Sequence, residues 1–88
     1  MEIMHDPERK IFIAAKDGKK MGELTYTLQN NVVNFNHTFV DPAARGLGVA
    51  RQLVDAGAAF AADAGYKAKA SCSYADKVLK SSYPQLLV

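Results

Sequence analysis

His37 is the side chain in this sequence best placed to accept a proton from a substrate near neutral pH. An imidazole has an ordinary pKa of about 6.5, so this residue could serve as a general base. The same residue alternates with Val33, Phe35 and Phe39, and we expect all four side chains to share one face of a strand. Because that face is apolar, His37 could instead be a buried histidine with a structural role. The sequence leaves both interpretations open.

Cys72 and Tyr74 are two further candidates for proton or group transfer, and both lie where a predicted strand gives way to a predicted helix. A helix N-terminus lowers the pKa of a thiol, so Cys72 could protonate a leaving group or accept an acyl group covalently. Tyr74 could supply a proton in its place. The alternatives are a small buried cysteine and an aromatic side chain that packs at the start of the helix.

A glycine-containing turn connects a strand, stopped by Pro42, to a helix that begins near Val49; its sequence is Arg45-Gly46-Leu47-Gly48-Val49-Ala50. The first N–H groups of a helix have no acceptor within the helix, and the helix dipole makes that end positive. Arg45 adds a full charge beside them. The turn is therefore a predicted site for phosphate or pyrophosphate. It is not a P-loop, which needs a lysine followed by Ser or Thr, nor a dinucleotide fingerprint, which needs a third glycine where Arg51 stands.

The hydrophobic patterns predict the element order β-β-β-α-β-α. Asp17-Gly18 and Asn30-Asn31 favour tight turns between the first three strands, and the fourth strand returns parallel to the third through a right-handed crossover. The predicted fold class is α+β, with a mixed sheet of about four strands and two helices. The predicted strands are Glu8–Lys16, Met21–Leu28, Val32–Val40 and Tyr66–Ser71; one helix runs from about Val49 to Gly65, and a second begins at Ser73 and is broken by Ser81-Ser82-Tyr83-Pro84. The apolar Leu86-Leu87-Val88 must then close the core or meet a partner.

Length and composition exclude several classes of protein. With 88 residues, we expect one domain covering residues 1–88. A net charge of +2 from scattered lysines gives no basis for nucleic-acid binding, and no apolar run approaches the ~20 residues of a membrane span. One cysteine and two histidines provide no disulfide and no zinc spacing, so no metal is expected. The N-terminus lacks the order of a secretory signal, which predicts a cytoplasmic protein.

Three sequence blocks together resemble a small branch of the GNAT superfamily of N-acetyltransferases. They are His37-Thr38-Phe39-Val40-Asp41-Pro42, the Arg45 to Ala50 turn, and Ser71-Cys72-Ser73-Tyr74, which match His-Thr-x-Val, Arg-Gly-x-Gly-Ile-Ala and Cys-x-Tyr. Gly22 to Tyr26 and Tyr83 to Leu86 also fit, so the resemblance covers nearly the whole chain.

The resemblance implies a GNAT fold and acetyl-coenzyme A as the acetyl donor. It implies that the backbone of Phe39 and Val40 pairs with the pantetheine amides and that Arg45, Gly46, Leu47, Gly48, Val49 and Ala50 hold the pyrophosphate. The thioester would then lie near Cys72 and His37, and Lys77 or Lys80 could meet the nucleotide end.

Two departures from the superfamily pattern bear on catalysis. The tyrosine that commonly protonates the leaving thiolate would fall near Leu79, so Cys72 or Tyr74 would have to substitute. The chain also lacks the N-terminal helices that shape an acceptor pocket in larger members. An acceptor site here would be shallow, shared with a second copy, or formed by the acceptor itself.

We therefore predict an N-acetyltransferase that moves an acetyl group from acetyl-coenzyme A to an unidentified amine, either directly or through an acetylated Cys72. The expected oligomeric state is a monomer or a homodimer. The alternative is a coenzyme A-binding or protein-interaction module with little catalytic activity. A small nucleic-acid-binding domain is a third hypothesis, which would require steeply salt-dependent binding.

Overall fold

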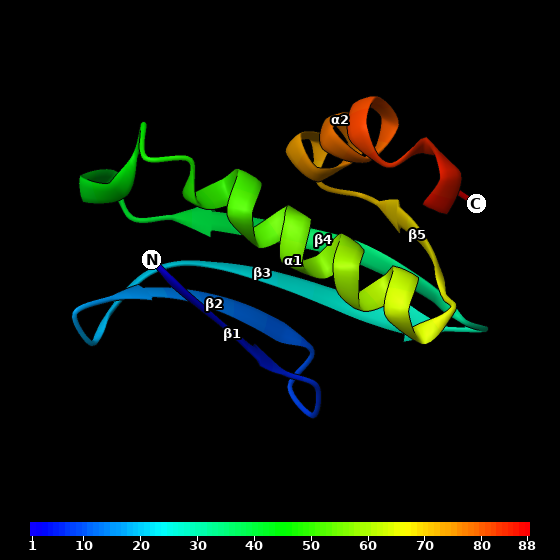
Figure 1. Cartoon of the computed structure of the whole chain (residues 1–88), viewed down its shortest axis with the longest axis horizontal. Helices are drawn as coiled ribbons and strands as arrows, with labels where there is room; N and C mark the ends of the chain where they lie inside the picture. Colours follow the sequence, from blue (N-terminus) through cyan, green and yellow to red (C-terminus); the bar gives the residue numbers. More distant parts are fainter.

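A computed structural model describes residues 1–88 as a five-stranded mixed sheet with two helices (Figure 1). The strands lie in sequence order; β1 to β4 pair antiparallel, and β5 pairs parallel to β4. The strands are β1 (Glu2–Asp6), β2 (Ile11–Lys16), β3 (Lys19–Gln29), β4 (Val32–Val40) and β5 (Lys67–Ala70). The helices are α1 (Val49–Ala64) and α2 (Ser73–Ser82), with short 3-10 helices η1 (Pro42–Ala44) and η2 (Pro84–Leu86). The predicted α+β class and mixed sheet are confirmed.

The two predicted hairpin turns form where the sequence places residues that tolerate left-handed backbone. Asp17 and Gly18 have φ of 52° and 78°, and Asn30 and Asn31 have φ of 51° and 64°. Two consecutive positive φ values define the hairpin turn whose twist matches that of the flanking strands. These turns fix the antiparallel order of β2, β3 and β4.

The prediction of about four strands missed β1. Its residues Ile3 and His5 point toward the helices, and the His5 ring stacks on Phe12 with centroids 4.1 Å apart and planes 6° apart. The His5 Nε2 atom also lies 2.6 Å from the Tyr26 hydroxyl. Strands are recognised by alternating apolar residues, and a histidine is normally counted as polar. Here the His5 ring packs inward like an apolar aromatic, so the alternation of β1 is hidden in the sequence. The first predicted strand accordingly starts at Ile11 rather than at Glu8.

Helix α1 packs closely on the sheet because small residues face the strands. A Cβ atom on Gly57 would lie 2.6 Å from the Phe35 ring, so only glycine fits there. Gly65, with φ of 77°, ends the helix as predicted, and the Tyr66 N–H closes it with a hydrogen bond to the Ala61 carbonyl. The largest fully buried side chains of this core are Phe35, Leu24, Leu53, Leu79, Val33, Val49 and Val54.

A β-bulge at Asn36 reverses the alternation of β4. Tyr26 pairs with Phe35 and Thr25 pairs with His37, which leaves Asn36 as an extra residue in β4. Beyond the bulge His37 and Phe39 point to solvent, whereas Thr38 and Val40 are partly buried. The expectation that His37 and Phe39 share the inward face of Val33 and Phe35 is therefore wrong. The same finding excludes His37 as a buried structural histidine.

The C-terminal residues complete the edge of the sheet. Leu86 is buried in the core, Leu87 bridges to Ala68 of β5, and only Val88 is largely exposed. The Lys67 ammonium donates to the Gln85 carbonyl at 3.0 Å, which holds this segment against β5. Of the two predicted roles for the apolar end, closing the core is confirmed for Leu86. No helix of the chain is long and apolar enough to cross a membrane.

Candidate active site

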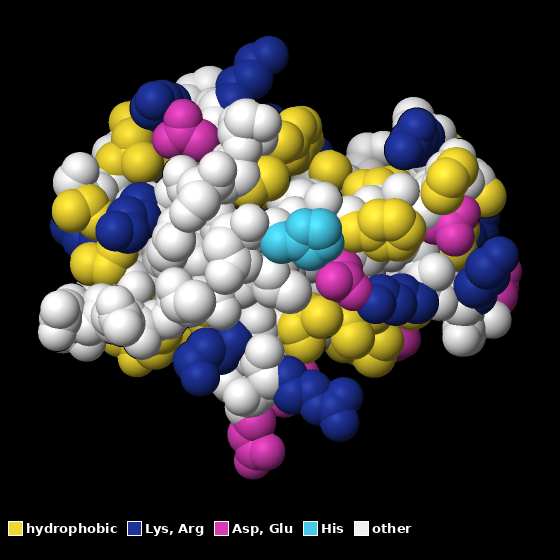
Figure 2. Space-filling view, turned by 180° about the vertical axis from the view of Figure 1, so that it is seen from behind, with side chains coloured by type: hydrophobic (Ala, Val, Ile, Leu, Met, Phe, Trp, Pro, Cys, Tyr) yellow, Lys and Arg dark blue, Asp and Glu magenta, His cyan; other side chains and the backbone are white.

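Strands β4 and β5 pair over only four residues and then separate. The ladder runs from Val32 opposite Lys67 to Phe35 opposite Ala70. The Phe35 carbonyl accepts the N–H groups of Ser71 and Cys72, at 3.0 and 3.3 Å, where the chain leaves the sheet to enter α2. The second half of β4 therefore has an open edge, and Figure 2 shows a notch in the molecular surface on this side of the protein.

The backbone groups on the open edge belong to Thr38 and Val40. The Asp41 N–H donates to the Met21 carbonyl of β3 at 2.8 Å, and residues of an antiparallel strand face alternate sides. By this alternation Phe39 turns its N–H and C=O to β3, and its neighbours turn theirs to the open edge. Of the predicted residues Phe39 and Val40, only Val40 has its backbone groups on the open edge. The second residue with backbone groups there is Thr38, not Phe39. The sequence alone could not show this, because it depends on which residues of β4 bond to β3.

The glycine-containing turn presents unpaired N–H groups to the same side. Gly46 and Gly48 have φ of 85° and 74°, values that a side chain disfavours. Leu47 is different, because its N–H donates to the Ala44 carbonyl at 3.2 Å. The N–H groups that find no acceptor within the chain are those of Gly46, Gly48, Val49, Ala50 and Arg51. Five such donors at the positive end of α1 can receive an anion.

A cavity of about 210 Å³ lies over this turn. Two arginines and no acidic residue line it, and Tyr74 of α2 forms part of its wall. Of the predicted ligand-binding residues, Leu47 and Phe39 lie outside the lining. The cavity is bounded by Val40, Ala44, Arg45, Gly46, Gly48, Val49, Ala50, Arg51 and Tyr74. The sequence-predicted turn, the end of β4 and the start of α2 are thus brought together.

Cys72 lies at the root of this opening, in contact with Thr38. The Thr38 Oγ1 atom and the Cys72 Sγ atom are 3.2 Å apart. Partial burial of the thiol raises its pKa, but the Ala75 N–H, the Thr38 hydroxyl and the Tyr74 N–H outweigh burial, so the pKa of Cys72 lies below its ordinary value. A lowered pKa makes this thiol a better proton donor than an unperturbed thiol.

His37 lies on the outer face of the sheet, away from the helices. Its side chain is 57% exposed, and its Nε2 atom is 3.8 Å from a carboxylate oxygen of Glu23 on β3. No hydrogen bond joins it to Cys72 or Tyr74, which lie on the helix side. Glu23 was not among the sequence-predicted candidates, although its alternation with Leu24 places it on this outer face.

A model of the family described as GCN5-related N-acetyl-transferase matches residues 11–86. The chain belongs to this family. The N-acetyltransferase class predicted from the three sequence blocks is therefore confirmed at the level of the family, as is the GNAT fold. No curated protein matches the chain.

Solved N-acetyltransferases of this fold include one of nearly the same length. A GCN5-like protein from Staphylococcus aureus, provisionally assigned as an N-acetyltransferase, is 28% identical, with a TM-score of 0.72 over 99% of this chain and 87% of its own. The aminoglycoside N-acetyltransferase AAC(6')-Iy, solved with CoA, is 25% identical, with a TM-score of 0.62 over 89% of this chain and 66% of its own. An aminoglycoside acetyltransferase from an uncultured soil metagenomic sample shares the fold at 20% identity, with a TM-score of 0.65 over 85% of this chain. The chain spans only 57% of that enzyme.

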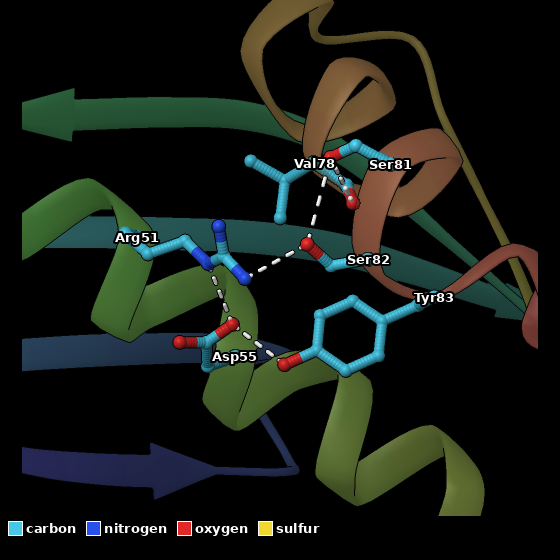
Figure 3. A network of polar contacts seen from close by, with 6 residues as sticks. All are labelled: Arg51, Asp55, Val78, Ser81, Ser82 and Tyr83. Atoms are coloured by element: carbon cyan, nitrogen blue, oxygen red, sulfur yellow. Dashed lines mark hydrogen bonds and ion pairs between the residues drawn. The ribbon is translucent and has the colours of Figure 1, made fainter.

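A polar network fixes the two helices of this GNAT domain relative to each other (Figure 3). Arg51 on α1 donates to Asp55 and to Ser82 of α2, both at 2.9 Å, and the Tyr83 hydroxyl donates to Asp55 at 2.6 Å. The predicted Arg51 and Asp55 pair is present. Because α1 begins at the glycine-containing turn and α2 begins beside Cys72, this surface network links the elements on the two sides of the opening.

The tyrosine common in larger GNAT enzymes has no equivalent phenol in this member. Leu79, where that tyrosine would fall, is fully buried in the core. The nearby Tyr83 is committed elsewhere, because its hydrogen bond to Asp55 and its burial raise its pKa above the ordinary value of 10. The side chains of Cys72 and Tyr74, on the helix side of the opening, each carry a proton that could be donated. No three His, Cys, Asp or Glu side chains of the protein come together to hold a metal ion.

Proposed function

We propose that this protein transfers an acetyl group from acetyl-coenzyme A to a primary amine. The observation that carries the proposal is the conjunction of an open β4 edge with five unpaired N–H groups at the start of α1. The amides of a pantetheine arm can hydrogen-bond to an open strand edge, and a pyrophosphate can accept hydrogen bonds from unpaired N–H groups at a helix start. That AAC(6')-Iy was solved with CoA and with a CoA bisubstrate analogue supports the same donor here.

The chain's own residues would bind the donor at three places. The backbone of Thr38 and Val40 would pair with the pantetheine amides as a strand would. The Gly46, Gly48, Val49 and Ala50 N–H groups would receive the pyrophosphate, with the Arg45 side chain beside them. Acetyl-coenzyme A supplies the activated acetyl thioester, which this placement directs toward Thr38 and Cys72.

His37 is the proposed base for the acceptor. An alkylamine with a pKa near 10.4 is about 3.4 pKa units from neutrality at pH 7, which costs about 4.6 kcal/mol. His37 takes one proton from the ammonium group, directly or through water, and the neutral nitrogen attacks the thioester carbonyl. The C–N bond forms and the C–S bond breaks, and the second nitrogen proton leaves to solvent.

Cys72 is the proposed acid for the departing thiolate. Because the pKa of the Cys72 thiol lies below that of an ordinary thiol, passage of its proton to the departing donor thiolate is favourable. Cys72 then regains a proton from solvent. The Thr38 hydroxyl and the helix N-terminus stabilise the Cys72 thiolate in the interval. We propose direct transfer, because this route needs no acetyl-cysteine intermediate.

The second candidate is a coenzyme A-binding module with little catalysis. The observation that favours it is the burial of Leu79, which removes the usual acid from the final helix. The two functions differ in turnover and not in binding of the donor.

Release of free thiol from acetyl-coenzyme A, measured with a panel of alkylamines, separates the two candidates. The enzyme should turn over at least one amine, and Cys72→Ala and His37→Gln should each lower kcat. Tyr74→Phe is the matched control on α2 and should retain activity if Cys72 is the acid. Binding of acetyl-coenzyme A without amine-dependent thiol release would favour the binding module.

A further inference from the structure

Glu23 lies between the side chains of Lys20 and His37 on the outer face of the sheet. One carboxylate oxygen is paired with the Lys20 ammonium, and the other is 3.8 Å from His37 Nε2. The Glu23 side chain is only 20% exposed, whereas that of Lys20 is 49% exposed. Figure 2 shows a histidine, an acidic and a basic side chain grouped in this way beside an exposed hydrophobic side chain, below the notch. The carboxylate is thus a shielded group that already holds a primary ammonium.

The cluster of Lys20, Glu23 and His37 adjoins the open edge from the side opposite the helices. Glu23 pairs with Phe39 in the ladder, and Thr25 pairs with His37. Thr38, between His37 and Phe39, points the other way and contacts the Cys72 thiol. One strand therefore separates the carboxylate and imidazole on one face from the thiol on the other. An acceptor and a donor that meet at this edge would arrive from opposite faces of the sheet.

The chemistry of the cluster selects a charged amine. A carboxylate attracts an ammonium group through charge and hydrogen bonding, whereas a neutral arylamine offers it only a weaker hydrogen bond. Lys20 demonstrates the fit, since its Nζ atom occupies the carboxylate within the same chain. Because the Lys20 side chain is half exposed and costs side-chain entropy to hold in place, its pair with Glu23 is weak, and an incoming ammonium group can replace it. An amine that replaces Lys20 on Glu23 lies close to His37, the proposed base, because Glu23 and His37 belong to neighbouring pairs of the β3 and β4 ladder.

We propose that Glu23 binds the ammonium group of the acceptor beside His37, and that Lys20 competes for the same carboxylate until an acceptor arrives. The acceptor class is then a primary alkylamine of the lysine side-chain type, presented on an extended or flexible carrier, because no helix covers this face. The inference rests on the proposed acetyl transfer and adds the acceptor's charge and its direction of approach. Glu23 is a binding residue in this scheme, and Lys20 is a regulator of its occupancy.

Steady-state kinetics with three variants test the proposal, using Nα-acetyl-lysine methylamide and the neutral arylamine 4-methoxyaniline at saturating acetyl-coenzyme A. Glu23→Gln should raise KM for the lysine amide about tenfold, while KM for the arylamine stays unchanged. Lys20→Met should lower KM for the lysine amide several-fold with kcat unchanged, and Lys20→Arg should leave it near the wild-type value. Equal effects of Glu23→Gln on both amines, or no fall in KM for Lys20→Met, would overturn the proposal.

A binding measurement keeps the inference testable even without turnover. The His37 imidazole resonances should shift on titration of the lysine amide into the protein saturated with coenzyme A. The dissociation constant should fall in Lys20→Met, and the shift should vanish in Glu23→Gln. Calorimetric affinity for acetyl-coenzyme A should be the same in all variants. A lost donor affinity would count against the proposed function, whereas an unmoved His37 resonance with intact donor affinity would contradict the acceptor site alone.

Discussion

The hydroxyl of Thr38 and the thiol of Cys72 meet at 3.2 Å although the two residues are 34 positions apart. The contact exists because the bulge at Asn36 turns Thr38 toward the helix side, where α2 begins at the end of the neighbouring strand β5. It joins the open edge of β4 to the N-terminus of α2, at the root of the opening between β4 and β5.

Removal of the Thr38 hydroxyl should raise the pKa of the Cys72 thiol. The hydroxyl is one of the groups that lower this pKa against the effect of burial. The rate of iodoacetamide alkylation as a function of pH reports the pKa. The wild-type midpoint should lie below the ordinary thiol value of 9.0, and Thr38→Val should move it upward. Thr38→Ser, which keeps the hydroxyl, should stay close to the wild type; a wild-type midpoint at or above the ordinary value would contradict the assignment.

Loss of the Cys72 thiol should slow acetyl transfer. In the wild type, Cys72 itself should not become acetylated. A positioned general acid contributes about 10²–10⁴-fold, so Cys72→Ala should lower kcat within that range. Acetyl-coenzyme A binding should be retained, because the pyrophosphate cradle lies in another element. Intact mass spectrometry after mixing with acetyl-coenzyme A alone should find no acetyl-cysteine. Rapid stoichiometric acetylation of Cys72, passed on when amine is added, would replace direct transfer by the covalent route.

The stability of the fold should fall in acid in a way that depends on His5. Burial lowers the pKa of this imidazole, and the Asp6 carboxylate offsets only part of that shift. The folded state prefers the neutral ring, so the unfolded chain binds the proton more readily. The stability contributed by His5 is present above its ordinary pKa of 6.5 and is lost as pH falls through the folded pKa.

Urea unfolding of the wild type and of His5→Gln at pH 7.5 and 5.5 measures this effect. The wild type should lose more free energy of unfolding between the two pH values than the variant does. The comparison cancels the titration of the carboxylates, which both proteins share. An equal loss in the two proteins would show that the stacked His5 is not the titrating group.

Gly57→Ala should destabilise the protein, against the usual trend for a helix. Alanine gains about 1 kcal/mol of helix propensity, but its Cβ would lie 2.6 Å from the buried Phe35 ring, and overpacking costs about 1–3 kcal/mol. We expect a net loss of about 1 kcal/mol in chemical denaturation. Ala59→Gly on the exposed side of α1 is the control and should lose about 0.8–1 kcal/mol from propensity alone. A more stable Gly57→Ala would show that α1 can move away from the sheet.

Local signals in the sequence predicted the parts of the fold that local chemistry determines. The Asp17-Gly18 and Asn30-Asn31 turns, the glycine-containing turn and the Gly65 helix end each need a left-handed backbone, and the residues that allow it are visible in the chain. Their spacing predicted the order of the central elements. Of the turn residues predicted to hold an anion, all but Leu47 line the cavity, and the Leu47 N–H closes the turn instead.

The outer half of the site could not be predicted, because it depends on how two strands pair. The bulge at Asn36 is a property of β3 and β4 together, and a continuous alternation placed His37 and Phe39 on the wrong face. Strand β1 was missed for a related reason, since the role of His5 becomes clear only when Phe12 and Tyr26 surround it. The proximity of Glu23 to His37 likewise requires the register of the folded sheet.

Calorimetric titration of acetyl-coenzyme A into the wild type, Gly48→Asn and Gly48→Asp is the most direct test of the proposed donor site. Asn and Asp both tolerate the left-handed backbone of Gly48 and are nearly equal in size, so the two variants differ chiefly in charge. The wild type should bind, Gly48→Asn should retain measurable affinity, and Gly48→Asp should bind at least tenfold more weakly than Gly48→Asn while remaining folded. Equal affinities in Asn and Asp variants, or no binding by the wild type, would contradict a pyrophosphate cradle at the start of α1.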